Sequence, residues 1–172
     1  MANRSDLFAL FDQHGINHET VEHPAFFTVE DGRAFKAQMP GGHSKNLFVK
    51  DKKRALYLAV AHCDTKVDLV ALGKTIGAKG RLSFGKPDLM EETLGVTPGS
   101  VTPFALMNTN PESLNQVILD SALFKWDKVW FHPLENTAST GVSPDGLLAF
   151  LAALGFEPLI LDLAAPQTLA DD

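Results

Sequence analysis

The chain has one cysteine and no long apolar run, and each shortage excludes a class of protein. With Cys63 as its single cysteine, the chain has no internal disulfide framework. No apolar run approaches the roughly 20 residues that a membrane-spanning helix needs, so we expect no membrane association. The first residues, MANRSDLFAL, lack the basic segment and apolar stretch of a signal peptide. These absences lead us to expect a soluble cytoplasmic protein.

The sequence also lacks the common catalytic signatures. It has no GxSxG turn of serine hydrolases, and neither a GxxxxGK[ST] loop nor a GxGxxG turn for nucleotide phosphates. Zinc motifs such as HExxH or paired CxxC are missing as well. His14, His18 and His23 are spread across a predicted helix end and a predicted strand, so their rings need not converge. We expect neither a metal nor a cofactor.

Composition predicts one compact domain over residues 1–172. The chain is 45% hydrophobic and 21% charged, and no shift in composition marks a boundary. The net charge of −6 argues against sequence-independent DNA binding, so we expect no DNA partner.

Cations nevertheless gather locally. Lys50, Lys52, Lys53 and Arg54 surround a single acid, Asp51. A second basic group follows, and its members are Lys74, Lys79, Arg81 and Lys86. The first group is either a solvated hairpin turn or a basic face turned toward a phosphate backbone.

Alternating helical and strand patterns predict a mixed α/β fold. The expected strands are 17–23, 46–50, 55–61, 104–108, 116–120, 128–133 and 158–163. The expected helices are one that Ser5 caps and Gly15 stops, one from Thr28 to Pro40, and 65–77, 86–95 and 143–155. The last helix has the clearest start, because Ser143 can cap it, Pro144 suits its first position and Asp145 lies in its first turn.

Polar residues open a strand that soon becomes apolar. The stretch GGHSKNLFVKD places Lys45 and Asn46 directly before Leu47 and Phe48. A hairpin needs no such groups at this point, whereas a binding or catalytic site does. Similar polar loops occur at GSVTP, residues 99–103, and at FHPLENTAST, residues 131–140. Each loop has a purely structural interpretation when it is taken singly.

Taken together, these segments resemble the YbaK and prolyl-tRNA synthetase editing-domain family, and most of all its freestanding members of the ProX kind. The resemblance rests on GGHSKNLFVKD (41–51), LGVTPGSVTPFAL (94–106) and FHPLENTASTGVSPDGLLAFL (131–151), and it extends from about Leu7 to Leu163. It implies a curved mixed β-sheet surrounded by helices. It also implies that the protein hydrolyses mischarged Ala-tRNA(Pro) and spares Pro-tRNA(Pro). The expected partners are therefore mischarged tRNA(Pro) and prolyl-tRNA synthetase.

The resemblance also implies roles for individual residues. Lys45 falls on the lysine most important for activity in the family, with Asn46 beside it. Residues 99–103 match the family's GxxxP loop. The resemblance therefore implies that Gly99, Ser100 and Thr102 are the catalytic loop residues and that Pro103 holds the loop's shape. His132 corresponds to the histidine that lines the amino-acid pocket. The basic stretch Lys50, Lys52, Lys53 and Arg54 is a candidate tRNA-binding surface.

Elementary chemistry agrees with such a site. An aminoacyl ester is already activated, so its hydrolysis needs a positioned water and a place for the oxyanion. Lys45 then acts as a cation toward the terminal phosphate or ester oxygens, because an ammonium is a poor base. A substrate ribose hydroxyl orients the water. Proline is expected to be excluded by its size. We expect the walls of the amino-acid pocket to be formed by Val29, Leu47, Phe48 and His132.

Three other functions remain open from the sequence. One is a deacylase of the same family that acts on Cys-tRNA(Pro) or another small aminoacyl group. Another is a noncatalytic nucleic-acid-binding module that uses Lys45 and the basic face. The third is a thiol-dependent hydrolase that uses Cys63, although a lone cysteine is more often a small buried hydrophobe.

Overall fold

The computed structural model describes residues 1–25, 32 and 35–164. The start of the helix predicted from Thr28, and the predicted pocket residue Val29, lie outside this part of the chain. Among the described residues, no helix has the length and apolar character that crossing a membrane requires.

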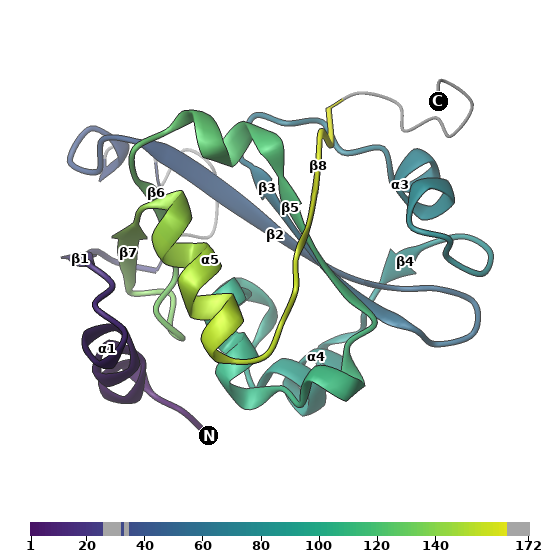
Figure 1. Cartoon of the computed structure of the whole chain (residues 1–172), viewed down its shortest axis with the longest axis horizontal. Coiled ribbons are helices and arrows are strands. Elements are labelled where there is room, and N and C mark those ends of the chain that lie inside the picture. Colours follow the sequence, from purple (N-terminus) through teal and green to yellow (C-terminus); the bar gives the residue numbers. More distant parts are fainter. Residues whose placement is uncertain (26–31, 33–34, 165–172) are drawn as a thin grey trace.

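A mixed β-sheet runs through the centre of the molecule (Figure 1). Its strands follow the order β1-β7-β6-β2-β3-β5-β8, and β4 pairs with β2. The strands are β1 (Glu19–Glu22), β2 (Gly42–Lys50), β3 (Leu56–His62), β4 (Ser83–Phe84), β5 (Gln116–Asp120), β6 (Val129–Phe131), β7 (Ala138–Val142) and β8 (Leu159–Leu161). The pairs β6–β2, β3–β5 and β5–β8 are parallel, and the others are antiparallel. This architecture is the mixed α/β domain predicted from the sequence.

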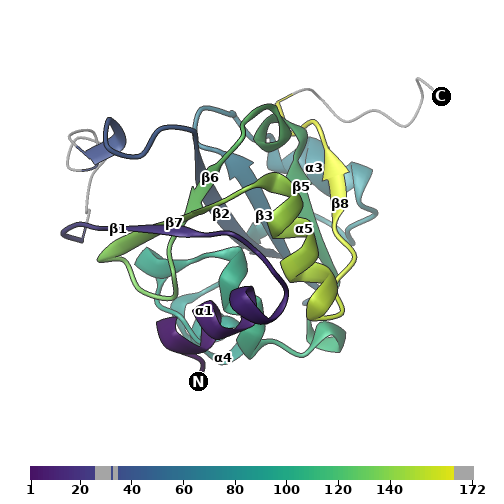
Figure 2. The ribbon, with the colours of Figure 1, turned by 60° about the vertical axis from the view of Figure 1, so that its left-hand side comes forward.

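Helices cover both faces of the sheet. The α-helices are α1 (Arg4–Gln13), α3 (Leu69–Thr75), α4 (Pro87–Leu94) and α5 (Pro144–Ala153). Short 3-10 helices, η1 (Pro98–Ser100), η2 (Pro103–Asn108), η3 (Pro111–Ser113) and η4 (Ser121–Lys125), fill the connections. In Figure 2, α1, α4 and α5 lie together on one side of the strands, and α3 lies toward the other.

Two apolar cores follow from these layers. The larger core joins α1, α4, α5 and η2 to one face of the sheet, and Phe11, Phe104 and Phe150 meet at its centre with ring centroids 5.2–5.7 Å apart. The smaller core packs Leu72 of α3 against Val49 and Tyr57 on the opposite face. Burial on both faces explains why β3 consists almost wholly of apolar residues.

The predicted hairpin of β2 and β3 is confirmed. The strands pair antiparallel from Ser44 opposite His62 to Lys50 opposite Leu56. The observed β2 starts earlier than predicted, at Gly42, so the polar residues that precede Leu47 are part of the strand. Gly41 makes this start possible, because its φ is +128° and a Cβ there would lie 2.4 Å from the Lys128 carbonyl oxygen.

Several local expectations are corrected by the structure. The cap of α1 is Asn3, which forms a capping box with Asp6, and not Ser5. The segment predicted as strand 104–108 is the 3-10 helix η2, because Pro103 begins it and Thr102 caps it. The α5 boundary signals are confirmed, since Ser143 accepts a hydrogen bond from the Gly146 N–H. Strand β7 was not anticipated.

The basic turn between β2 and β3 is held by a buried carboxylate. Asp51 is only 4% exposed, and its carboxylate accepts hydrogen bonds from the backbone N–H groups of Lys53, Ala55 and Lys79 at 2.9–3.0 Å. Burial acts to raise the pKa of Asp51, but the three N–H donors outweigh it, so the pKa lies below its ordinary value. Asp51 thereby ties the hairpin to the loop that carries Lys79.

We expect Asp51→Ala to lower the free energy of unfolding by about 2–4 kcal/mol, because it leaves buried N–H groups without an acceptor. Urea denaturation followed by circular dichroism measures the change. Asp127→Ala, which removes an exposed loop carboxylate, is the matched control and should stay within about 0.5 kcal/mol of the wild type. Equal stability of the two variants would show that Asp51 does not hold the turn.

Candidate active site

A cavity lies beside an unpaired length of β2. On the edge of β2 that faces away from β3, β6 pairs at Gly42 and His43, and β4 pairs at Val49 and Lys50. Among the described strands, none pairs with this edge between those two points. The cavity in this gap has a volume of about 310 Å³. Its walls come from β2, from the η1 segment and from the end of β6.

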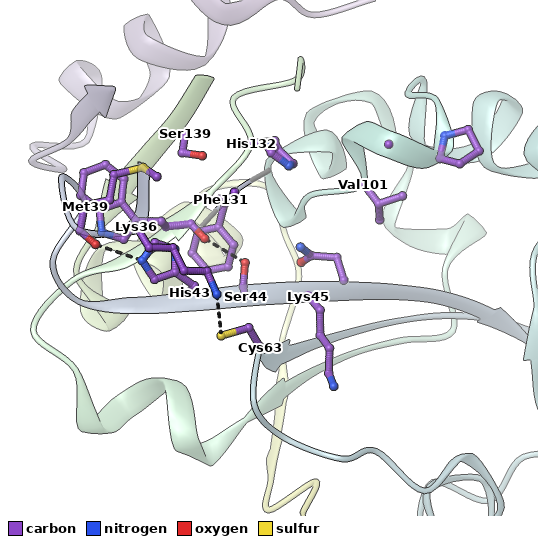
Figure 3. Close-up of a pocket in the computed structure, with 15 residues that line it drawn as sticks. Lys36, Met39, His43, Ser44, Lys45, Cys63, Val101, Phe131, His132 and Ser139 are labelled. Carbon is purple, nitrogen blue, oxygen red and sulfur yellow. Dashed lines mark hydrogen bonds between the residues drawn. The ribbon is translucent and has the colours of Figure 1, made fainter. Parts of the chain in front are cut away.

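The structure brings four of the predicted site residues to this cavity. Lys45 and Asn46 line it from β2, Gly99 from η1, and His132 from the residue after β6 (Figure 3). These residues are far apart in the sequence, and the parallel pairing of β6 with the start of β2 is what brings His132 beside Lys45.

Two expected pocket walls lie elsewhere. Phe48 is 2% exposed and belongs to the larger core. Its ring packs on Gly85 so closely that a Cβ added to Gly85 would lie 2.4 Å from the ring. Leu47 packs against the smaller core on the opposite face. Neither side chain lines the cavity, because both lie farther along β2, where the two cores cover its faces. This corrects the expectation that Leu47 and Phe48 form its walls.

The predicted catalytic loop is also only partly at the cavity. Gly99 and its neighbours Pro98 and Val101 line it, whereas Ser100, Thr102 and Pro103 do not. The Ser100 N–H donates to the Thr97 carbonyl at 2.9 Å, so that N–H is already engaged. Thr102 caps η2, and Pro103 is buried at the first position of that helix. All three residues therefore have a structural role. The catalytic roles expected for Ser100 and Thr102 stay predictions, and neither residue lines the cavity.

Neighbouring polar residues of β2 project to opposite sides of the strand. Figure 3 shows the Lys45 side chain running away from His132, on the side of β2 where Cys63 lies. Ser44 lies on the other side and donates its hydroxyl to the Trp130 carbonyl at 2.8 Å. Within the described structure, the buried Oδ1 of Asn46 has no hydrogen-bond partner. Asn46 therefore lines the cavity and keeps a buried acceptor without a partner.

His132 is held as a neutral ring with a defined tautomer. Its Nδ1 lies 3.0 Å from the Ala138 carbonyl oxygen, which can only accept, so Nδ1 carries the proton and Nε2 keeps its lone pair. Burial lowers the pKa of His132, and the charge of His23 adds to this, while the hydrogen bond to Ala138 opposes it. The ring offers the cavity a hydrogen-bond acceptor at neutral pH.

A buried pair behind His132 was missed by sequence reasoning. His23 Nδ1 lies 2.8 Å from the Pro24 carbonyl oxygen, and its Nε2 lies 2.8 Å from Oγ of Ser139, which lines the cavity. The His23 and His132 rings meet edge to face at 6.2 Å. His23 and Ser139 are 116 positions apart, so no local pattern links them.

Cys63 does not have the character of a strong nucleophile. Burial raises the pKa of its thiol, and this outweighs the opposing effect of Lys36, whose Nζ lies 3.9 Å from Sγ. His43, on the same side of the cavity, donates from Nε2 to the Met39 carbonyl at 2.9 Å, and burial lowers its pKa. The thiol is therefore protonated near neutral pH, in contrast to an activated catalytic cysteine.

The predicted tRNA-binding cations lie at the far end of β2 from Lys45. Lys52, Lys53 and Arg54 are exposed on the turn, and Lys50 ends the strand. The Lys52 N–H donates to the Lys79 carbonyl at 2.9 Å, so the second basic group joins the first at this end of the molecule. About five residues of extended strand, roughly 17 Å at 3.4 Å per residue, separate Lys45 from Lys50.

Comparison with known proteins gives a consistent result. A sequence profile of the aminoacyl-tRNA editing domain matches residues 23–150. The chain is 38% identical to mouse prolyl-tRNA synthetase associated domain-containing protein 1, with 92% of this chain and 95% of the relative covered. It is 32% identical to the prolyl-tRNA editing protein ProX of Acetoanaerobium sticklandii, with 90% and 94% covered.

The fold has solved counterparts as well. A structure described as a candidate trans-editing enzyme for prolyl tRNA synthetase superposes with a TM-score of 0.70 at 22% identity, and 95% of this chain and 98% of that chain are covered. At this identity the likeness concerns the fold alone. It shows that this chain and that structure share the same fold.

We expect the pKa of His132 to lie below the value of about 6.5 for an unperturbed histidine, because the buried ring resists protonation. NMR titration of the assigned ring protons measures it, with the urea-unfolded chain as the reference. A folded pKa below the unfolded one means that His132 costs stability as the pH falls through about 6.5. Titration of His132 at or above the unfolded value would contradict the neutral-ring assignment.

Proposed function

The chain belongs to the aminoacyl-tRNA editing domain family, and from that premise we propose that it hydrolyses mischarged Ala-tRNA(Pro) and spares Pro-tRNA(Pro). One observation carries the proposal: a single cavity joins a lysine, an amide with an unused acceptor, a glycine loop and a neutral histidine. These groups suit the hydrolysis of an activated ester, which requires orientation and charge stabilisation more than a strong nucleophile.

The glycine loop receives the reacting carbonyl. Gly99 has no side chain, so the backbone of this segment can approach the ester closely, and Val101 closes the same wall. The oxyanion of the tetrahedral intermediate then forms next to backbone dipoles that stabilise its charge. Because the Ser100 N–H is engaged with Thr97, the dipoles available at this wall are those of Gly99 and Val101.

Asn46 and the substrate together position the water. The buried Oδ1 of Asn46 accepts a hydrogen bond from the attacking water or from the ribose hydroxyl next to the ester. A buried acceptor without a partner is costly, so a bound substrate that supplies a donor gains binding energy at this point. In this scheme the ribose hydroxyl takes a proton from the attacking water as it passes its own proton to the departing ester oxygen, so both ribose hydroxyls end protonated and no protein base is required.

Lys45 binds charge and does not abstract a proton. Its side chain runs away from His132, toward the outer side of the cavity, which supports contact with the terminal phosphate or the ester oxygens. An ammonium group at neutral pH is an effective partner for these oxygens and a poor base. The lysine therefore fixes the acceptor end of the tRNA above the cavity.

Selectivity is proposed to be steric. His132 and Ser139 form a wall whose shape is set by the hydrogen bonds to Ala138 and His23. A methyl side chain fits beside such a fixed wall, and a proline ring collides with it, which discriminates more strongly than filling space would. Leu47 and Phe48 take no part, since both face the cores.

The basic end of β2 is proposed to hold the tRNA body. Lys52, Lys53 and Arg54 stand exposed on a turn that Asp51 fixes, and Lys79 adds to them. Exposed cations of this kind attract phosphates independently of sequence and give salt-dependent affinity. Prolyl-tRNA synthetase, from which a mischarged tRNA would come, is the proposed protein partner.

Direct measurement separates the three alternative functions from the proposed one. Deacylation of Ala-, Cys- and Pro-tRNA(Pro) side by side distinguishes an alanine editor from a cysteine editor of the same family. A module that only binds tRNA would retain binding and show no turnover. A thiol mechanism would require Cys63, so Cys63→Ala would then abolish hydrolysis, whereas the proposed mechanism retains most of it.

We expect Lys45→Ala to lower the rate of Ala-tRNA(Pro) deacylation by at least about tenfold, because the cation that places the substrate is lost. Single-turnover rates measure the effect, and circular dichroism checks the fold. Lys125→Ala, at an exposed lysine on η4, is the matched control and should retain the wild-type rate. Wild-type turnover by folded Lys45→Ala would refute the assignment.

We expect His132→Ala to lower the ratio of Ala-tRNA(Pro) to Pro-tRNA(Pro) hydrolysis, because the shortened wall admits the larger ring or misplaces the smaller substrate. The ratio of the two kcat/KM values is the measurement, and Lys125→Ala again serves as the control. If both rates fall equally and the ratio holds, His132 contributes to catalysis and is not the size filter.

A further inference from the structure

Three potential metal ligands meet where β3 ends and the next turn begins. His62, Cys63 and Asp64 each offer one ligand atom, and these atoms all lie within 4.8 Å of one another. The Cys63 Sγ and a carboxylate oxygen of Asp64 are 3.8 Å apart. A tetrahedral ion with bonds of about 2.0–2.3 Å brings its ligand atoms within about 4 Å of each other, so small side-chain rotations suffice to close the set.

The backbone that carries these ligands is fixed. Asp120 is fully buried and accepts hydrogen bonds from the His62 N–H at 3.0 Å and from the Thr65 hydroxyl at 2.7 Å. The Cys63 N–H donates to the His43 carbonyl at 2.8 Å. These bonds hold the turn from both sides, so binding an ion there requires little ordering of the chain.

The His62 ring is oriented for ligation. It stacks on Trp126 with ring centroids 5.6 Å apart and an interplanar angle of 6°. Its Nδ1 accepts a hydrogen bond from the Asp64 N–H at 3.1 Å, so this nitrogen carries the lone pair, and an ion bound there takes the place of that hydrogen bond. A neutral imidazole with a directed lone pair is the form that binds a transition metal.

We propose that His62, Cys63 and Asp64 form a binding site for a divalent ion of the zinc class. One nitrogen, one sulfur and one carboxylate oxygen are ligand types that zinc and cadmium take, and a three-ligand set leaves one position for water. Binding releases the Cys63 proton to solvent as the sulfur–metal bond forms. The ion has no part in the proposed hydrolysis, which needs no metal.

Nearby charges set the strength of the site. The Lys36 ammonium, 3.9 Å from Cys63 Sγ, opposes a cation and must turn away, whereas Asp64 favours it. Lys36 is exposed, so its displacement costs little. Cys63 also lines the cavity at β2, which places the ion at the cavity's edge.

Titration of the purified protein with Cd²⁺ tests the site directly. We expect one ion per chain, a thiolate-to-metal charge-transfer band in the ultraviolet, and a change in Trp fluorescence because Trp126 stacks on His62. Zn²⁺ should displace Cd²⁺ and remove the band. Absence of binding by the wild type would overturn the proposal.

Variants separate a three-ligand site from a lone thiol. Asp64→Asn and His62→Gln should each weaken Cd²⁺ affinity by at least about tenfold, and Cys63→Ser should remove the band. His18→Gln is the matched control, because it breaks another histidine–carboxylate pair, His18 with Asp12 at 3.2 Å, and should leave the affinity unchanged. Undiminished affinity in Asp64→Asn, whose exposed side chain is not needed for folding, would reduce the site to a lone cysteine and refute the proposal.

A consequence for activity rests on the proposed function. An ion at the cavity edge adds positive charge and bulk beside the substrate, so Zn²⁺ should slow Ala-tRNA(Pro) hydrolysis in the wild type and less so in Asp64→Asn. The binding titration needs no substrate, so it stands or falls independently of the deacylase assignment.

Discussion

The pairing of β2 with β3 places consecutive side chains of β2 on opposite faces of the sheet, from Ser44 opposite His62 to Lys50 opposite Leu56. A slip of one residue would exchange the faces, sending Phe48 out of the larger core and Lys45 into it. Burial of apolar groups on both faces therefore enforces one register. The same register fixes where each polar group of the site projects.

The cavity exists because the strand on the other edge of β2 is short. β6 leaves β2 after His43, and the Ser44 hydroxyl bonds to the Trp130 carbonyl where the strands separate. Had β6 continued alongside β2, ladder hydrogen bonds and packed side chains would occupy the space that the cavity takes. The candidate site thus uses an interruption in a sheet, with strands on either side of it.

Local sequence signals predicted the elements whose causes are local. The hairpin is two apolar runs around a charged turn, and α5 has its cap, its proline and its acidic first turn within three consecutive residues. The segment 104–108 was predicted wrongly because its apolar composition suits a strand, whereas Pro103 and the Thr102 cap set a 3-10 helix. Strand β7 was missed because its residues, ASTGV, carry little strand signal and are ordered by pairing with β1 and β6.

The site was predictable to the extent that its residues lie in recognisable motifs. Lys45, Asn46, Gly99 and His132 reach the cavity, whereas Leu47 and Phe48 were assigned to it from their nearness in sequence and instead lie where the cores cover both faces of β2. The His23–Ser139 pair depends on a contact over 116 positions and has no sequence signal.

The order Ser44, Lys45, Asn46 now has a physical reason. A substrate that combines an ester with a phosphate presents a polar but compact reacting centre and, a few ångströms away, a charge that prefers solvent. In the proposed mechanism adjacent strand residues meet both needs at once, because Asn46 lines the cavity while Lys45 projects from the other side of the strand. A strand end bordered by Gly41, whose missing side chain lets the chain approach Lys128, is therefore a suitable place for such a pair.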